Sequence, residues 1–484
     1  MKRTVHNWDR FDFGPGPQPK HRLYQGPFPF EEVPGWEVVM ATTPSLDVVH
    51  NFGSGFITYM VDEVGVPYQD TQQLHAYLDE LAAFPLGNIM YIRVNWKDIQ
   101  KQPGRLDPAA HWQMTFELAE KYKKRVAFRV MLSNPDIPGL AIPEFVEQKV
   151  PMVKIGTYLG RMQYEPEYNH PYFQSAFQEL HELLAARYNG NPLIEFIDTA
   201  MYGFWGEGHT WPYDFTSLPD QDTACRTFLD LFDIQRRLWS KVPLVTNTQP
   251  DFSHAGNDAL LDETVKTHNW IRTDTIFIEN QQIDALSNRP AWCASISEVG
   301  ISDGEEKNLF LDESVTLSDN VVYHVKDIGA NYWSLWNWHK IAASRLKKYY
   351  AQYPSAIDHL ARSIGYRVRP SWIWQFKKGD VPGLVIGFVN DGIAGVPGVL
   401  EVVVERADGT VLAYGDLDAG YPLPGKVWQA LFLLPTGTVW EGLRLKAYIH
   451  VKGMKYPVCW ACKQQLTDDG ALILRLTRGL SFKV

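Results

Sequence analysis

The sequence predicts an α/β fold, a (β/α)8 barrel followed by an antiparallel β-sandwich. Between residues 51 and 362, short runs of β-branched and aromatic residues alternate with amphipathic helical segments, which is the pattern of a parallel barrel. Between residues 366 and 484, β-rich runs are separated by turn dipeptides such as Asp391-Gly392, which is typical of a small sandwich. Residues 1–50 are rich in Pro, Gly and aromatic residues, and we expect them to form an extension packed on the barrel.

Each expected barrel strand is a short apolar run, as strands buried on both faces should be. The runs lie at residues 55–60, 88–94, 125–132, 193–203, 243–248, 270–276, 292–299 and 331–338. A doubly wound sheet would alternate in the same way, but no glycine-rich phosphate loop follows the first strand. The sandwich strands are expected at residues 384–390, 399–405, 410–417, 427–434 and 443–451.

The helices between the barrel strands show capping residues and apolar stripes. Asp107 followed by Pro108 predicts a helix start, because Asp caps the first backbone N–H groups and Pro fits the first turn. Trp112, Phe116 and Ala119 then recur at helical spacing, which predicts one buried face.

Composition and charge narrow the classes of partner. Lys and Arg total 46 against 56 for Asp and Glu, a net charge of −10, which argues against nucleic acid or an anionic membrane as partner. No uncharged apolar run approaches the roughly 20 residues of a membrane helix. The N-terminus lacks an apolar signal-peptide core, so we expect a cytoplasmic location, or secretion if a leader was removed. Homo-oligomerisation is left open. Aromatic residues make up 13% of the chain, which suits sugar stacking as well as core packing.

The cysteines and histidines predict neither a metal site nor a cofactor. Four cysteines give no disulfide framework. Cys459 and Cys462 form a single CxxC pair, whereas a structural zinc site needs four ligands. Cys225 and Cys293 are interpreted as small buried hydrophobic residues. No H-E-x-x-H or H-x-H pattern occurs.

Two glutamates come at the ends of expected barrel strands, where the active residues of such barrels lie. Glu207 follows the fourth strand in the run YGFWGEGHTW, and Glu298 stands at the tip of the seventh in SISEVG. Glycoside hydrolysis needs such a pair, because one carboxyl protonates the leaving oxygen while the other attacks carbon or activates water. The alternative interpretation of each glutamate is a solvated loop residue.

Several segments resemble the retaining (β/α)8 glycoside hydrolases of the large clan that includes β-galactosidases. Residues 94–112 resemble the clan's strand-two signature, W-x-x-I-x-x-x-x-G-x-x-D, and residues 332–339 resemble its aromatic strand eight, whose Trp forms the floor of the sugar subsite. The match covers roughly residues 50–345. The run G-F-W-G-E-G-H also resembles barrel proteins with a Gly-x-Trp-Gly-Glu-x-His motif. It departs from the clan at Gly206, where the clan usually has an Asn that binds the sugar 2-hydroxyl.

The resemblance implies hydrolysis of a glycosidic bond in an oligo- or polysaccharide, with net retention and without a cofactor. It makes Glu298 the ionised nucleophile and Glu207 the acid/base. We expect Glu207 to be kept protonated by the surroundings of Trp205 and by nearby negative charge. Two alternatives stay open, an inverting glycosidase of the same fold and a carbohydrate-binding barrel without catalysis.

Further candidates for substrate binding lie in or just after the barrel strands. A cation inside a barrel strand needs a partner, so Arg93 and Arg129 either orient a catalytic carboxylate or form structural ion pairs. Amides there suit sugar hydroxyls or turns, and aromatic residues stack on sugars or fill the core. Asp198 is the substitute acid if Glu207 points away. The set is Arg93, Asn95, Trp96, Arg129, Asp198, Tyr202, Trp205, His209, Asn247, Trp336 and Trp338, with Asp62 and Glu63 as candidates for holding a terminal sugar.

Overall fold

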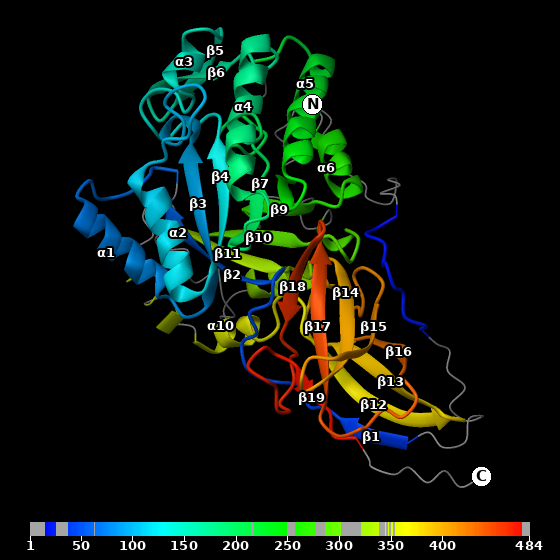
Figure 1. Cartoon of the computed structure of the whole chain (residues 1–484). Helices are drawn as coiled ribbons and strands as arrows, with labels where there is room; N and C mark the ends of the chain where they lie inside the picture. The colour runs from blue at the N-terminus through cyan, green and yellow to red at the C-terminus, as the bar shows by residue number, and fades with distance from the viewer. Residues whose placement is uncertain are drawn as a thin grey trace.

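The computed structural model places a barrel at one end of the molecule and two antiparallel sheets at the other (Figure 1). No described helix is long and apolar enough to cross a lipid bilayer. The structure describes residues 15–25, 37–61, 63–213, 217–248, 257–275, 286–301, 321–337, 344, 347, 350–351 and 354–476.

Eight parallel strands close into a barrel, which confirms the predicted fold class. Each strand pairs with the next in chain order, and the last pairs back with the first. The strands are β2 (Gly55–Val61), β3 (Gly87–Asn95), β4 (Arg125–Met131), β7 (Ile194–Asp198), β8 (Leu244–Asn247), β9 (Trp270–Thr275), β10 (Ser295–Ile301) and β11 (Tyr332–Asn337).

Helices cover the outside of the barrel. They are α1 (Thr71–Ala82), α2 (Ala110–Tyr122), α3 (Glu144–Glu147), α4 (Pro171–Tyr188), α5 (Gln221–Leu238), α6 (Asn257–Lys266), α8 (Val321–Asp327) and α10 (Pro354–Ala361), with a short 3-10 turn, η2, at Trp96–Asp98. The predicted cap at Asp107 is wrong. The Asp107 amide donates to the Ile99 carbonyl at 2.8 Å, so the chain is still turning there, and α2 begins at Ala110.

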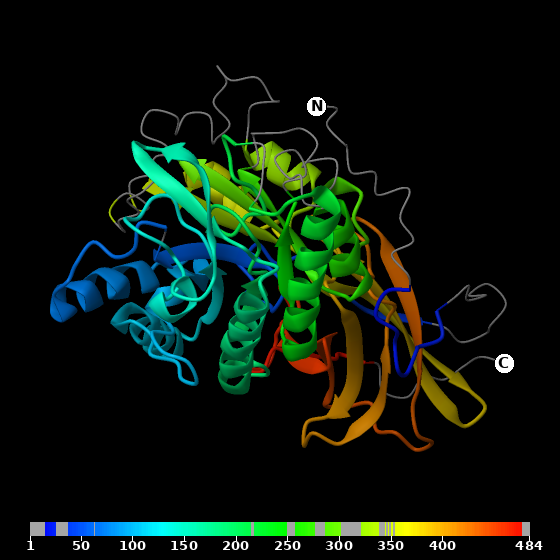
Figure 2. The ribbon, with the colours of Figure 1, turned by 90° about the horizontal axis from the view of Figure 1, so that it is seen from above.

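The fourth barrel strand is shorter than predicted, and this difference shapes the site. The run 193–203 was predicted as one strand, but β7 ends at Asp198. The residues that follow leave the sheet and turn toward α5. A hairpin of β5 (Met152–Tyr158) and β6 (Arg161–Pro166), which was not predicted, lies between β4 and α4 in the chain and projects from the barrel (Figure 2).

The C-terminal region forms the predicted sandwich of two antiparallel sheets. One sheet has the order β1–β12–β13–β16, and the other β15–β14–β17–β18 with β19 against β17. The strands are β1 (Glu37–Ala41), β12 (Val368–Lys378), β13 (Val381–Asn390), β14 (Val399–Arg406), β15 (Val411–Asp416), β16 (Val427–Leu433), β17 (Leu443–Val451), β18 (Met454–Val458) and β19 (Leu472–Ile473). Four of these, β1, β12, β18 and β19, were not predicted.

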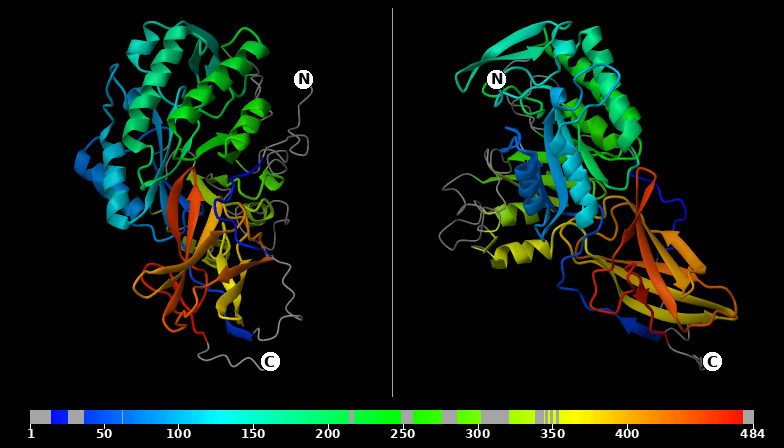
Figure 3. Two further views of the ribbon diagram at one scale, coloured as in Figure 1. Left: turned by 45° about the vertical axis from the view of Figure 1, so that its right-hand side comes forward. Right: turned by 60° about the vertical axis from the view of Figure 1, so that its left-hand side comes forward.

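The N-terminal extension contacts both regions. Its strand β1 pairs with β12 of the sandwich, and Arg22 forms a bridge with Asp416. On the barrel side, the carbonyl of Pro15 lies 3.1 Å from His268 Nε2. The barrel and the sandwich themselves join through Phe52, whose ring stacks on Tyr456 at 3.7 Å. Figure 3 shows the sandwich as a lobe beside the barrel.

Candidate active site

Glu207 lies in a tightly coiled loop after β7. The coil is closed by hydrogen bonds from the Phe204 amide to the His209 carbonyl at 2.8 Å and from the Gly208 amide to the Tyr202 carbonyl at 3.0 Å. Gly203 has φ +78°, and a Cβ atom there would lie 2.1 Å from the His209 carbonyl oxygen. Only glycine therefore fits, and the coil points the Glu207 side chain back into the barrel.

Trp205 adopts a backbone conformation that is rare for a bulky residue, with φ +56°. Two contacts hold it there. Its indole N–H donates to Asp136 Oδ2 at 2.7 Å, and its carbonyl accepts a hydrogen bond from Arg129 Nη1 at 3.1 Å. Strain that is held by surrounding contacts is typical of functional sites.

Glu298 points into the barrel interior from the middle of β10, and not from the strand tip as predicted, because β10 continues to Ile301. Both of its carboxylate oxygens lie 2.8 Å from Arg93 Nη2. Arg272 Nη2 also donates to Oε2. Glu298 is only 1% exposed and Glu207 4%, so both charges depend on partners within the protein.

Those partners form one buried ionic cluster inside the barrel. Three arginines from β3, β4 and β9 face four carboxylates, so positive and negative charges are nearly balanced. Arg129 contacts Asp198 at 2.9 Å and Glu207 at 2.7 Å, while Arg272 contacts Asp198 and Glu298. The members are Arg93, Arg129, Arg272, Glu63, Asp198, Glu207 and Glu298.

Arg93 connects the two predicted catalytic glutamates. One nitrogen of its guanidinium lies 3.4 Å from Glu207 Oε1, and the other lies 2.8 Å from Glu298 Oε1. Glu63, from the loop after β2, pairs with the same guanidinium. Burial and then the charge of Arg129 lower the pKa of Arg93 to about 10. One side chain therefore holds both glutamates in a common site.

The structure overturns the expectation that Glu207 is kept protonated. Burial raises its pKa, but the hydrogen bond from His209 and the charges of Arg129 and Arg93 outweigh burial, so the pKa lies well below its usual range. His209 Nδ1 accepts a hydrogen bond from the Trp211 amide at 3.2 Å. This contact leaves the Nε2–H to face Glu207 Oε2, 3.4 Å away.

Glu165, at the end of β6, is the described carboxyl near this loop whose pKa is raised, to about 7, mainly by burial. Its Oε2 accepts a hydrogen bond from the Tyr168 hydroxyl, and its Oε1 is buried with no hydrogen-bond partner among the described residues. The Tyr168 hydroxyl also accepts a hydrogen bond from the Gly203 amide at 3.1 Å, which connects Glu165 to the Glu207 loop. The sequence analysis missed Glu165 because its strand was not predicted.

Two predicted amides lie at the edge of the cluster. Asn247, at the end of β8, donates to the Glu207 carbonyl at 3.2 Å, and its own Oδ1 is buried with no described partner. Asn95 accepts a hydrogen bond from Asn134 at 3.0 Å, and Asn134 also donates to the Glu63 carbonyl at 2.7 Å. Asn247 therefore supports the backbone at Glu207, and Asn95 is linked to the backbone at Glu63 only through Asn134.

Trp96 and Tyr202 are placed in the core, which corrects their prediction as sugar contacts. Trp96 is fully buried, and its ring lies against Phe173 of α4 at 5.8 Å. Tyr202 stacks on Phe228 of α5 at 4.0 Å. The predicted shared face of Asp198 and Tyr202 fails because β7 ends at Asp198. Asp62, Trp338 and the side chain of Trp336 lie outside the described residues.

Arg272 is the functional candidate that the sequence analysis passed over. It has the same signal as Arg93 and Arg129, a cation inside an apolar barrel strand. Tyr91 was also missed. Its hydroxyl donates to Asp198 and accepts from Arg272 at 3.1 Å. Among the described residues, no cluster of His, Cys, Asp and Glu suits a metal ion, and all four cysteines are free.

Comparison with known proteins gives distant similarity alone. No family model and no curated protein matches the sequence. Among solved structures, the catalytic domain of β-amylase from Paenibacillus polymyxa is 8% identical with a TM-score of 0.43, covering 63% of this chain and 98% of its own.

Two further structures are similar at the same level. The PgaB (BpsB) glycoside hydrolase domain from Bordetella bronchiseptica is 12% identical, with a TM-score of 0.41 over 64% of this chain and 98% of that one. Endo-glycoceramidase II from Rhodococcus sp. is 12% identical, with a TM-score of 0.36 over 81% of this chain and 100% of that one. Likenesses this weak assign neither a family nor an activity.

Proposed function

We propose that the protein is a glycoside hydrolase acting on an oligo- or polysaccharide. The observation that carries the proposal is that Glu207, in the loop after β7, and Glu298, in the middle of β10, share one buried site bridged by Arg93. Paired carboxyl groups at the C-terminal end of a barrel are the arrangement that glycosidic cleavage requires.

In this proposal Glu298 is the nucleophile. Two guanidinium groups, those of Arg93 and Arg272, contact it, and both favour the ionised carboxylate that attacks the anomeric carbon. Arg272 also contacts Asp198, so the position of Glu298 is coupled to the strand that leads into the Glu207 loop. The product of attack is a glycosyl-enzyme, and hydrolysis then gives net retention.

Glu207 is the acid/base in the same proposal. Its ionised state in the free protein suits the second step, in which it takes a proton from water. For the first step it must gain a proton. Its contact with Arg93 at 3.4 Å is longer than that with Arg129 at 2.7 Å. We infer that a bound sugar displaces the Arg93 contact, which would raise the Glu207 pKa by removing one of the charges that lower it.

The test is turnover of an aryl-glycoside panel by Glu207→Gln, Glu298→Gln and Glu207→Ala. We expect each glutamine variant to lose at least about 1000-fold in kcat/KM. Glu207→Ala should recover on substrates with good leaving groups, because these need no protonation. Glu182→Gln, an exposed site on α4, is the matched control. Full activity in either the Glu207 or the Glu298 glutamine variant would contradict the assignment.

Proton NMR of the first-formed product separates retention from inversion. A retaining enzyme has its two carboxyl groups about 5–5.5 Å apart, and an inverting enzyme about 6.5–9.5 Å apart, with room for water. We expect the first-formed anomer to match the configuration of the substrate. The opposite anomer would assign Glu298 as the base that activates water.

A second candidate function is carbohydrate binding without turnover. The lowered pKa of Glu207, caused by His209 and the two arginines against the opposing effect of burial, favours it, because an acid that stays ionised cannot protonate a leaving group. Calorimetry on a glycan panel, combined with product analysis, distinguishes the two. Binding without released sugar would support the second candidate and contradict the first.

A further inference from the structure

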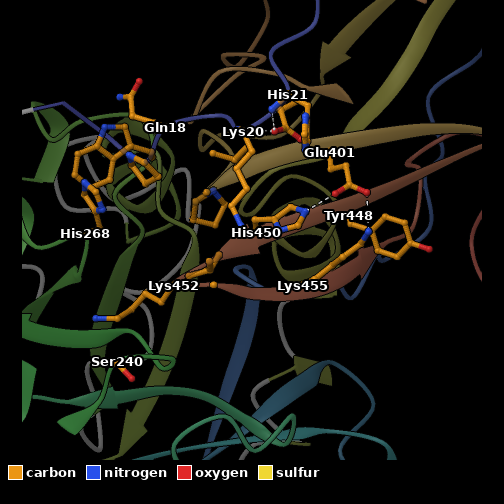
Figure 4. Close-up of a pocket in the computed structure, with 18 of the residues that line it drawn as sticks. Gln18, Lys20, His21, Ser240, His268, Glu401, Tyr448, His450, Lys452 and Lys455 are labelled. Carbon is orange, nitrogen blue, oxygen red and sulfur yellow. Dashed lines mark hydrogen bonds and ion pairs between the residues drawn. The ribbon is translucent and has the colours of Figure 1, made fainter. Parts of the chain in front are cut away.

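A large pocket lies between the barrel and the sandwich, away from the glutamate pair. Its volume is about 1090 Å³, and it is lined by the N-terminal extension, the barrel and the sheet that contains β14 and β17 (Figure 4). That volume slightly exceeds the range of about 300–1000 Å³ typical of small-molecule sites. The pocket can therefore admit a ligand larger than a single ion.

The pocket lies at the N-terminal ends of barrel strands and contains neither residue of the glutamate pair. On the barrel side, the pocket is lined by Ser240, His268, Trp270 and Trp292. Trp270 is the first residue of β9, and the other three precede β8, β9 and β10. Glu207, in contrast, follows β7, and Glu298 lies in the middle of β10. The pocket is thus separate from the proposed active site.

Three lysines bring positive charge to this pocket without a carboxylate partner. They are Lys20 from the extension, Lys266 from the end of α6 and Lys452 from the β17–β18 turn. No described Asp or Glu lies within 4.0 Å of their amines. The uncompensated charge is notable in a chain whose net charge is −10.

The carboxylates of the pocket are occupied elsewhere. Glu401 pairs with His450 at 2.7 Å and with Lys455 at 2.6 Å. Asp416 accepts hydrogen bonds from the backbone amides of Lys20 and His21 at 2.7 and 2.8 Å. In Figure 4 the amine of Lys452 points away from the Glu401–His450 pair. The three lysines therefore stay available for another anion.

Lys452 occupies a backbone position that normally selects a different residue. It has φ +47° in the two-residue turn Lys452-Gly453 between β17 and β18, where Asn or Gly is usual. Its side chain reaches across to the barrel and donates to Asn269 Oδ1 at 2.8 Å. Burial and the charge of Arg236 lower its pKa to about 8, as expected for an ammonium without a counter-charge. A lysine is thus kept where both backbone and solvation disfavour it.

We propose that this pocket binds a small molecule through a tetrahedral oxyanion, a phosphate or sulfate group, held by Lys20, Lys266 and Lys452. Ammonium groups from three separate segments supply charge-assisted hydrogen bonds to such a group. The ligand would join the extension, the barrel and the sandwich, because each contributes one of the three lysines. The site is independent of glycosidic cleavage.

The test is calorimetric titration of the full chain with inorganic phosphate and with glucose 6-phosphate at low ionic strength. We expect Lys452→Gly and Lys266→Ala each to weaken binding of both probes about tenfold, since each removes one charged hydrogen bond. Lys378→Ala, an exposed lysine at the end of β12, should bind as wild type does. Glu298→Gln should also bind normally, which separates this site from the proposed activity.

We expect the Lys452→Gly variant to fold, because glycine adopts a positive φ more readily than lysine does. A loss of binding in this variant is then not caused by unfolding. Its melting temperature should equal or exceed that of the wild type. The proposal fails if neither probe binds the folded wild type, or if both probes bind Lys452→Gly and Lys266→Ala as tightly as wild type.

Discussion

The barrel interior and the pocket beside the sandwich handle charge in opposite ways. In the barrel, Arg93, Arg129 and Arg272 are at most 2% exposed, and each contacts at least two carboxylates. In the pocket, Lys266 is exposed, Lys452 is half-buried, and neither has a described carboxylate partner. A buried charge is costly unless it is paired within the fold. Lys266 avoids this cost because it is exposed, whereas burial lowers the pKa of Lys452.

The choice of cation follows the same division. A guanidinium presents several donors in a fixed plane, so Arg93 contacts Glu63, Glu207 and Glu298 at once. A lysine amine on a flexible chain adapts to a ligand that is not part of the protein. This difference indicates that the barrel site is already formed without substrate, whereas the pocket site is completed by its ligand.

The largest expected difference in the free energy of unfolding is between the removal of a cation from the barrel and the removal of a cation from the pocket. Arg272→Met leaves Asp198 and Glu298 with one cation fewer, and we expect a loss of about 3–5 kcal/mol in the free energy of unfolding. Lys266→Met should change it by less than about 0.5 kcal/mol. Urea denaturation measures both. Equal effects would mean that the two regions do not differ in this way.

The pH dependence of stability at two carboxyl groups, Glu165 and Glu401, tests the comparison further. Burial raises the pKa of Glu165 to about 7, so its neutral form stabilises the fold. That contribution is complete below the ordinary pKa near 4.5 and is lost as pH rises through about 7, a change of about 3 kcal/mol. We therefore expect Glu165→Gln to gain stability relative to wild type over this range, as measured by denaturation at several pH values.

Glu401, in the pocket, should behave in the opposite sense. Burial raises its pKa, but the hydrogen bonds from Lys455 and His450 prevail and lower it. Its ionised form therefore contributes stability above the ordinary pKa, and this is lost as pH falls through the lowered value. Glu401→Gln should lose stability relative to wild type as pH rises from below 4. The same sign of pH dependence in both variants would refute the contrast.

A pair of glycines tests how tightly the Glu207 loop is built. Gly203→Ala places a Cβ 2.1 Å from the His209 carbonyl oxygen, whereas at Gly104, with a similar φ of +79°, nothing lies within 4 Å. Both substitutions incur the left-handed backbone penalty of about 1–2 kcal/mol. We expect Gly203→Ala to cost about 2 kcal/mol more through overpacking. Thermal or urea unfolding checks this, and equal losses would show that the loop can relax.

The smallest expected effect is at the turn of the pocket. Lys452→Gly relieves a non-glycine φ of +47°, and we expect a gain of about 1 kcal/mol in unfolding free energy. Leu159→Gly, at φ +46° in the β5–β6 turn, is the matched control. A stability loss in Lys452→Gly alone would show that the contact with Asn269 outweighs the backbone strain.

The order of barrel strands and the positions of the two glutamates follow from local sequence. Apolar runs predict the strands and place Glu207 after the fourth and Glu298 in the seventh, although β7 ends nine residues before Glu207 and β10 continues past Glu298 to Ile301. Prediction failed where local pattern and tertiary context disagree. Residues 199–203 are as apolar as a strand, yet they pack Tyr202 against α5 instead. The strand β12 was missed because Pro370 and several charges interrupt its apolar pattern.

The sequence by itself determined the fold class and the candidates for catalysis, because both depend on residues close together in the chain. The tertiary structure decided which of those candidates meet and in what charge state. Arg272 reaches Asp198 across 74 residues, and Arg93 reaches Glu298 across 205. The ionisation of Glu207 depends on contacts of this kind, because electrostatic interactions are set by distance in space and by burial. Local sequence predicts neither of these.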